Sequence, residues 1–172
     1  MIWKKLDEKI VYKGFRTILK RKYELPHGHV ADFDIIKSPD IVGILALTPD
    51  NKVIIVQQFR PGTEEIVDEI PAGMIDEGES PEVAAERELL EETGYKGKLT
   101  FLTSCLNSAY ATSKWYCFVA TDCRKVQEPT PEETESIKVF LKSLDDFKMQ
   151  LRDGKLTSVE TAFYGLDHLK LL

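Results

Sequence analysis

The chain has 172 residues, of which 42% are hydrophobic and 30% are charged. This length suits one globular domain, and the composition is too apolar for a disordered chain. The formal net charge of −6 argues against a nucleic-acid partner, because nucleic-acid binders present a basic surface. The acidity is concentrated: residues 64–92 hold 12 of the 29 acidic residues but only one of the 23 basic residues, Arg87. This segment therefore needs a chemical explanation.

The cysteines and the start of the chain indicate the compartment. Three cysteines without a Cys-x-x-Cys pair fit a reducing compartment better than a disulfide framework. The first ten residues are charged throughout and lack the apolar stretch of a signal peptide. The longest apolar run, Ile41–Leu47, is far too short to cross a membrane. We therefore expect a cytoplasmic protein without a membrane partner.

The first third of the chain predicts strands. Short β-type runs over residues 10–15 and 16–23, followed by a turn at 26–28, predict a small antiparallel sheet. Ile41–Leu47 is typical of a strand buried on both faces, and residues 52–59 predict a second strand after a turn. The expected organisation is an N-terminal β segment over residues 1–40 and a main domain over residues 41–172. The N-terminal strands have too little chain to cover both faces, so we expect this segment to pack across a homodimer.

The middle of the chain predicts a helix with clear ends. Residues 69–73 predict a short strand that ends in a glycine turn. Ser80 suits the N-cap, Pro81 suits the first helical position, and Gly94 suits the C-cap. The remaining elements follow in order: strands near 98–106, 114–121 and 136–141, then helices near 143–152 and 157–169. This mixture predicts an α/β sandwich rather than a regular doubly wound sheet.

The predicted helix concentrates negative charge. Spacing i, i+3, i+4 places three carboxylates on one face: Glu88, Glu91 and Glu92. Like charges at these spacings destabilise a helix, and only Arg87 lies near enough to relieve them. Clustered carboxylates on a rigid element suit a hard divalent cation, whereas the alternative is a solvated acidic face. Val83 and Leu90 lie on the opposite side, and we expect them to be buried.

A longer motif surrounds this helix. Gly73, five residues, Glu79, seven residues and then Arg87–Tyr95 resemble the Nudix box: Gly, Glu, Arg-Glu, an aliphatic residue, Glu-Glu, Gly and an aliphatic residue at fixed spacing. Every fixed position is present, and Tyr95 replaces the final aliphatic residue with an aromatic one. The preceding segments 57–61 and 69–76 resemble the ADP-ribose and nucleotide-sugar pyrophosphatase branch of this family. The resemblance extends over residues 9–169.

The resemblance implies a fold and a metal site. The implied fold class is α/β (α+β), a Nudix-type α/β/α sandwich with a mixed sheet and a small N-terminal antiparallel β segment. The implied cofactor is Mg²⁺, or Mn²⁺. Its implied ligands are the carboxylates of Glu88, Glu91 and Glu92 and the backbone carbonyl of Ala72. Arg87 would orient this carboxylate cluster through charge-assisted hydrogen bonds.

The resemblance also implies substrate and catalytic residues outside the box. Arg60 corresponds to an arginine that grips the substrate phosphates, and Glu69 is a further candidate for substrate binding. The general base is expected in the acidic loop before the 136–141 strand, at Glu132, Glu133 or Glu135, with Glu135 favoured and Glu133 next. Tyr110 is a candidate for the distal sugar site. Its loop lacks the Ser-Pro-Gly that ADP-ribose pyrophosphatases often carry at this place, which weakens the case for strict ADP-ribose specificity.

The predicted activity is hydrolysis of the pyrophosphate bond in a nucleotide-sugar substrate. ADP-ribose or a related ADP-sugar is the leading substrate class, with AMP and a sugar phosphate as products. The alternatives within the family are GDP-mannose, a dinucleoside polyphosphate or a nucleoside triphosphate. The alternative from another class is a Nudix-fold sensor that binds nucleotides without cleaving them. Such modules tend to lose box carboxylates, and all of these are present here.

Overall fold

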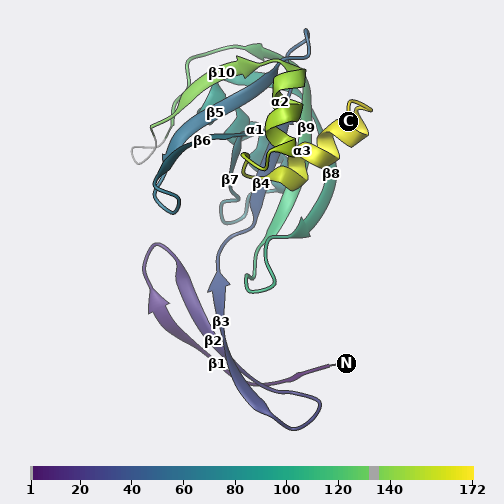
Figure 1. The fold of residues 1–172 in the computed structure, drawn as a ribbon. Helices are drawn as coiled ribbons and strands as arrows, with labels where there is room; N and C mark the ends of the chain where they lie inside the picture. The colour runs from purple at the N-terminus through teal and green to yellow at the C-terminus, as the bar shows by residue number, and fades with distance from the viewer. Residues whose placement is uncertain (1, 132–135) are drawn as a thin grey trace. The chain divides into compact units, whose positions relative to one another are not determined.

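The computed structural model describes residues 2–131 and 136–172 (Figure 1). The chain forms two compact units: Met1–Asp40 with Leu106–Lys114, and Ile41–Cys105 with Trp115–Leu172. The first unit therefore includes a segment from the middle of the chain, which the sequence did not indicate. None of the helices in the described ranges is both long and apolar enough to span a bilayer.

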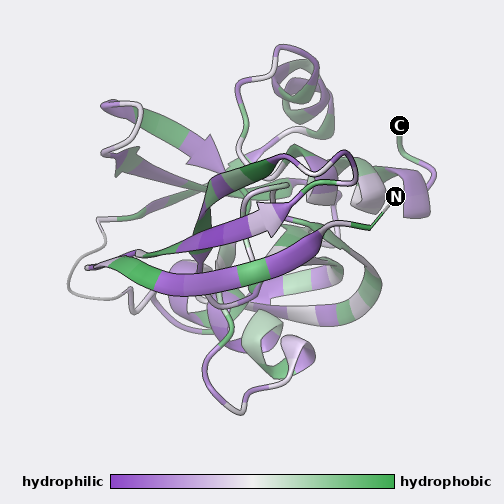
Figure 2. Cartoon of the chain, turned by 90° about the horizontal axis from the view of Figure 1, so that it is seen from below, coloured by the Kyte–Doolittle hydropathy of each residue, from purple (hydrophilic) through white to green (hydrophobic). Residues whose placement is uncertain are grey.

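The first unit contains a small antiparallel sheet, as predicted, and the structure gives this sheet three strands. Its strands are β1 (Lys4–Lys13), β2 (Thr17–Glu24) and β3 (Val30–Lys37), in that spatial order. The 106–114 segment lies along β3, where the Ile36 amide donates to the Tyr110 carbonyl at 2.8 Å and the Thr112 amide donates to the Ile36 carbonyl at 2.9 Å. Figure 2 shows hydrophobic and hydrophilic stretches interspersed along these strands.

This sheet leaves apolar side chains uncovered within the chain. All ten residues of β1 are exposed, and the exposed side chains include Ile10 and Tyr12. Three aromatic rings cluster on the sheet, with the Trp3 and Phe33 centroids 5.4 Å apart and Tyr23 edge-on to both. An uncovered apolar surface of this kind is typical of an interaction site.

The second unit contains two sheets. The strands are β4 (Ile41–Ala46), β5 (Val53–Arg60), β6 (Glu65–Glu69), β7 (Ala72–Met74), β8 (Tyr95–Leu106), β9 (Lys114–Lys125) and β10 (Lys138–Lys142). One sheet has the order β7-β4-β9-β8, and the other has the order β10-β5-β6. β4 runs parallel to β9 and antiparallel to β7, so the first sheet is mixed.

Helices cover both faces of the sheet that contains β4. The helices are α1 (Pro81–Thr93), α2 (Leu144–Arg152) and α3 (Val159–His168). Successive strand residues point to opposite faces, so Ile44 joins a core cluster with residues of α1, and Leu45 joins another with residues of α2 and α3. The predicted α/β/α sandwich is confirmed, and the burial of β4 on both faces explains its continuous apolar sequence.

The strand expected over residues 69–73 is wrong. Glu69 ends β6, and Ala72 begins β7, which belongs to the other sheet. Pro71 interrupts the run because it has no amide hydrogen to donate. Its carbonyl instead accepts a hydrogen bond from the Ile44 amide at 2.9 Å. This break carries the chain from one sheet to the other just before the box.

The expected buried face of α1 is also wrong. Val83 is 55% exposed and Leu90 is half-buried, whereas the alanines at 84 and 85 and Leu89 are buried. The small alanines permit close packing against β4 and β7, and Glu92, on the same side, is only 3% exposed. The helix therefore turns its carboxylate side toward the protein, because those carboxylates find hydrogen-bond donors there.

Candidate active site

Local sequence fixes the ends of α1. The Ser80 hydroxyl accepts a hydrogen bond from the Val83 amide at 3.3 Å, and Pro81 occupies the first turn. Gly94 caps the other end with φ of 76°, in the left-handed region that glycine tolerates, and its amide donates to the Leu90 carbonyl at 2.8 Å. These caps are the predicted ones, and they hold the carboxylates on a rigid helix.

Arg87 ties the carboxylates of the box together. Its Nη1 donates to Glu88 Oε1 at 2.7 Å and to Glu91 Oε2 at 3.2 Å. Its Nε and Nη2 donate to the two carboxylate oxygens of Glu79 at 3.0 and 2.9 Å, and Nη2 also reaches the Met74 carbonyl at 2.9 Å. These hydrogen bonds, first of all those to Glu79, raise the pKa of the Arg87 guanidinium. This network is the kind of contact through which Arg87 was expected to orient the carboxylates, and that role stays a prediction.

Glu79 supports the loop before the helix. Besides the two bonds from Arg87, it accepts one from the Asp76 amide at 3.1 Å. The hydrogen bonds from Arg87 lower the pKa of Glu79 most, against the opposing effect of burial. The Glu79 carboxylate therefore links the loop before the helix to α1.

Glu92 is buried beside the end of β7. Its Oε2 accepts a hydrogen bond from the Ala72 amide at 2.9 Å. Ala72 and Glu92 are 20 positions apart in sequence, so the helix packing creates this contact. Two of the predicted metal-site residues are thereby brought together.

Gly73 makes room for Glu88. A Cβ atom built on Gly73 would overlap the carboxylate of Glu88. Gly73 has no positive φ, so its absence of a side chain, and not a special turn, is what the site requires. The sequence prediction attributed this glycine to a turn, and the structure corrects that explanation.

The donor set of this helix face suits a hard divalent cation, because such ions prefer carboxylate oxygens. One nitrogen of Arg87 lies within hydrogen-bonding distance of both Glu88 and Glu91, so these two carboxylates converge. Among residues 2–131 and 136–172, no three His, Cys, Asp or Glu side chains gather into a metal-binding group. Here Arg87 and the Ala72 amide hold the carboxylates instead. The predicted ligand set of Glu88, Glu91, Glu92 and the Ala72 carbonyl stays a prediction.

Arg60 and Glu69 form a second charged group in the same unit. Arg60 ends β5 and Glu69 ends β6, and the antiparallel pairing of these strands brings them together. The guanidinium donates from Nε at 2.9 Å and from Nη2 at 2.6 Å to Glu69 Oε2. Sequence reasoning missed two further partners of Glu69: Gln58 and Thr157. Thr157 had no signal in the sequence, because it is 88 positions away.

The remaining candidates lie outside this unit or outside the described residues. Tyr110 belongs to the first unit, where it is 55% exposed and its amide donates to the Ser108 hydroxyl at 3.1 Å. The candidate bases Glu132, Glu133 and Glu135 fall within residues 132–135, which the structure does not describe. Their roles stay predictions.

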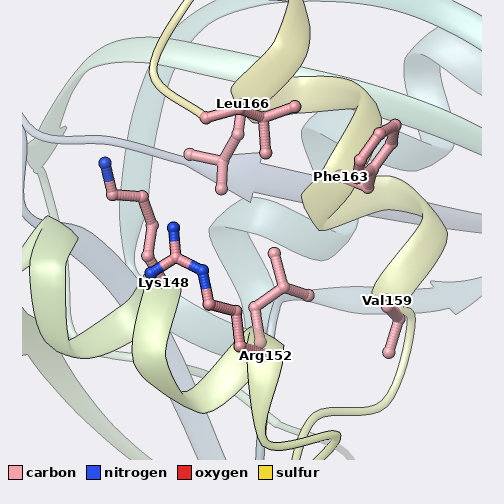
Figure 3. A pocket seen from close by; sticks show the side chains of 7 residues that line it. Lys148, Arg152, Val159, Phe163 and Leu166 are labelled. Carbon is pink, nitrogen blue, oxygen red and sulfur yellow. The ribbon is translucent and has the colours of Figure 1, made fainter.

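The described part of the second unit includes two hollows. One of about 440 Å³ runs beside α1, and its lining includes Arg87, Glu91 and the exposed Val83. The other, of about 300 Å³, lies between α2 and α3 (Figure 3). It is lined by apolar side chains together with Lys148 and Arg152, and none of the predicted site residues lines it. Of these two hollows, the first adjoins the box.

Comparison with known proteins identifies the family. The NUDIX domain model matches residues 37–160. The chain is 36% identical over 151 residues to an ADP-ribose pyrophosphatase of Bacillus subtilis (strain 168). The aligned region covers 86% of this chain and 81% of that protein. The chain is 32% identical, with the same coverage, to a methanol dehydrogenase activator of Bacillus methanolicus. A solved structure titled "Crystal structure of ADP compounds hydrolase" superposes with a TM-score of 0.84 at 26% identity and covers 99% of this chain and 95% of that one.

The fold, the carboxylate helix and these similarities define a hydrolase of the Nudix class. The chain belongs to the Nudix family and is a Nudix pyrophosphohydrolase, and its resemblance to the ADP-ribose and ADP-sugar branch is confirmed. Nudix hydrolases generally use divalent metal ions, in agreement with the oxygen-rich face of α1.

Proposed function

We propose that this protein hydrolyses the pyrophosphate bond of ADP-ribose or a related ADP-sugar in a Mg²⁺-dependent reaction, with AMP and a sugar phosphate as products. The observation that carries this proposal is the intact box network, in which Arg87 holds Glu88, Glu91 and Glu79 together. The similarity to an ADP-ribose pyrophosphatase over most of the chain supports the substrate class.

Each group of residues would have a distinct task. Arg60 would bind the phosphate oxygens, because a planar guanidinium matches them with paired hydrogen bonds. Glu135 or Glu133 would take the proton of the attacking water. The water oxygen would join one phosphorus atom, and the bridging oxygen would leave with the other phosphate. Divalent ions bound by Glu88, Glu91 and Glu92 would neutralise the pyrophosphate and lower the pKa of bound water.

The selectivity among sugars should be modest. The 108–113 loop lacks the proline and glycine of many ADP-ribose pyrophosphatases, so we propose that the distal sugar makes fewer specific contacts. A lost hydrogen bond to a sugar hydroxyl costs about 1–3 kcal/mol. We expect cleavage of ADP-ribose with a preference over other ADP-sugars of less than about two decades in kcat/KM. Tyr110→Ala should change the ranking of sugars more than the rate on the best one.

A substrate panel tests this proposal. ADP-ribose, other ADP-sugars, GDP-mannose, a dinucleoside polyphosphate and nucleoside triphosphates would be incubated with Mg²⁺ or Mn²⁺, and the nucleotide products would be separated and measured by ion-exchange chromatography. A chelator control establishes the metal requirement. Strong preference for a nucleoside triphosphate, without activity on any nucleotide-sugar, would overturn the proposed substrate class.

We further propose that the protein is a homodimer that pairs through its N-terminal sheet. The uncovered apolar residues of β1 support this proposal. Ile10 pairs with the buried Leu19, whereas the neighbouring Lys9 pairs with Lys20 and so points to the other face of the strand.

Light scattering at micromolar concentration should show a dimer for the wild type. Ile10→Gln should weaken it, because a polar side chain replaces one on the apolar face. The matched variant Lys9→Gln should leave it intact. A wild-type monomer, or equal effects of the two substitutions, would contradict pairing through this face.

A further inference from the structure

Glu69 is a buried carboxylate with donors from three other side chains. It is 4% exposed, and Arg60 and the buried Gln58 both donate to its Oε2, the latter at 3.0 Å. Thr157 donates from its hydroxyl to Oε1 at 2.8 Å. A buried charge requires such partners, so the arrangement holds the carboxylate in one orientation.

Thr157 reaches this carboxylate from a different part of the second unit. It lies in the loop between α2 and α3, and the preceding Leu156 is buried among residues of those helices and of β5. The following residue, Ser158, has φ of 60° and ψ of 40°, in the left-handed region that residues other than glycine rarely adopt.

The N-terminus of α3 also lacks the usual side-chain cap at Ser158. Serine at an N-cap usually accepts a hydrogen bond from the first helical turn, but the Ser158 side chain makes none with the described residues. A strained, uncapped start persists only where the surrounding structure imposes it. This start of α3 directly follows Thr157, whose hydroxyl donates to Glu69.

The Glu69 carboxylate also determines which edge of the Arg60 guanidinium is available to a ligand. Glu69 binds the edge of the guanidinium formed by Nε and Nη2. Nη1 donates no hydrogen bond to any of the described residues, and the side chain of Arg60 is 44% exposed. Two hydrogens on Nη1 and one on Nη2 therefore point away from Glu69, in the planar arrangement that matches phosphate oxygens.

We propose that Thr157 is a positioning residue for substrate binding: its hydroxyl fixes the Glu69 carboxylate, which in turn orients Arg60 toward a substrate phosphate. The proposal rests on the function proposed above, in which Arg60 binds the diphosphate. It assigns a role in substrate affinity to the loop before α3. This loop is far from Arg60 in the sequence. Thr157 itself does not contact the reacting atoms.

Thr157→Val keeps the shape of the side chain and removes its hydroxyl. Because Thr157 is exposed, the substitution should not disturb the core. We expect KM for ADP-ribose to rise about two- to tenfold, the effect of one net hydrogen bond, with kcat nearly unchanged. Thr157→Ser, which retains the hydroxyl, should restore most of the affinity. Thr100→Val, an exposed substitution of the same kind on β8, should have no effect.

A double-mutant cycle distinguishes positioning from a general loss of stability. In an Arg60→Lys background, which removes the fork of the guanidinium, Thr157→Val should add little to KM, because the group through which it acts is already altered. Thermal unfolding of each variant gives its stability separately. Equal KM values for Thr157→Val and the wild type, a fall in kcat alone, or full additivity in the cycle would overturn the proposal.

A binding measurement keeps this test separate from the proposed substrate. Calorimetric titration with inorganic pyrophosphate and Mg²⁺ measures affinity for the diphosphate without turnover, and Thr157→Val should raise its Kd by a similar factor. If the wild type failed to cleave ADP-ribose but the Kd still changed as expected, only the substrate assignment would fail. Equal Kd values, or no pyrophosphate binding by the wild type, would overturn the positioning role.

Discussion

Replacing Glu92 with glutamine should lower kcat more than about 100-fold while the fold is retained. The substitution keeps the size of the side chain, and its carbonyl oxygen can still accept the hydrogen bond from the Ala72 amide. It removes one negative charge from the proposed metal site. Loss of residues that only support metal ligands costs about 10- to 100-fold, so loss of a ligand should exceed that range.

Steady-state kinetics at saturating Mg²⁺, together with thermal unfolding, would measure this effect. The matched control is Glu86→Gln, an exposed position on the same helix, which should leave turnover close to that of the wild type. Near-normal turnover of Glu92→Gln at saturating metal would contradict its assignment as a ligand. Unfolding of the variant at much lower temperature would instead point to a structural role for the buried carboxylate.

Gly73→Ala should also abolish most of the activity, for a steric reason. The added methyl group would occupy the position of the Glu88 carboxylate, which lies at the end of a flexible side chain. Glu88 can rotate away at modest energetic cost, so we expect the fold to survive. Its carboxylate would then be misplaced, and a displacement of about 1 Å in an active site can cost about 100-fold in rate.

The matched control is Gly62→Ala, where a Cβ atom meets nothing within 4 Å. Both variants add one methyl group to a glycine without a positive φ, so both have similar effects on backbone freedom. We expect Gly62→Ala to retain activity and Gly73→Ala to lose it, with similar unfolding temperatures. Full activity of Gly73→Ala would show that the position of the Glu88 carboxylate is not essential.

The sequence was sufficient to predict the structural features that depend on local interactions. Ser80, Pro81 and Gly94 predicted both ends of α1, because capping depends on residues within one turn of the helix. The continuous apolar run after residue 40 predicted a strand buried on both faces, which β4 confirms. The fixed spacing of the box identified the family before any contact was known.

The tertiary structure decided the features that depend on packing between distant segments. Helical spacing places Val83 opposite the glutamates, but it does not say which side faces the protein. Donors on β7 and Arg87 favour burial of the carboxylate side, so Val83 is exposed. The sequence likewise does not show why position 73 must be glycine. The reason is that a side chain at this position would overlap a carboxylate from another element.

The surroundings of Arg60 show the same division. The family resemblance of the 57–61 segment implied a phosphate-binding arginine at this position, a role that stays a prediction and that suits a guanidinium group. The strand pairing that places Glu69 beside it, and the loop that brings Thr157 across 88 positions, arise only when the sheet and α3 pack together. Residue type and spacing therefore determined the family and the chemistry available to this protein. Packing between distant elements determined how the side chains are oriented, because no local rule fixes contacts between segments far apart in the chain.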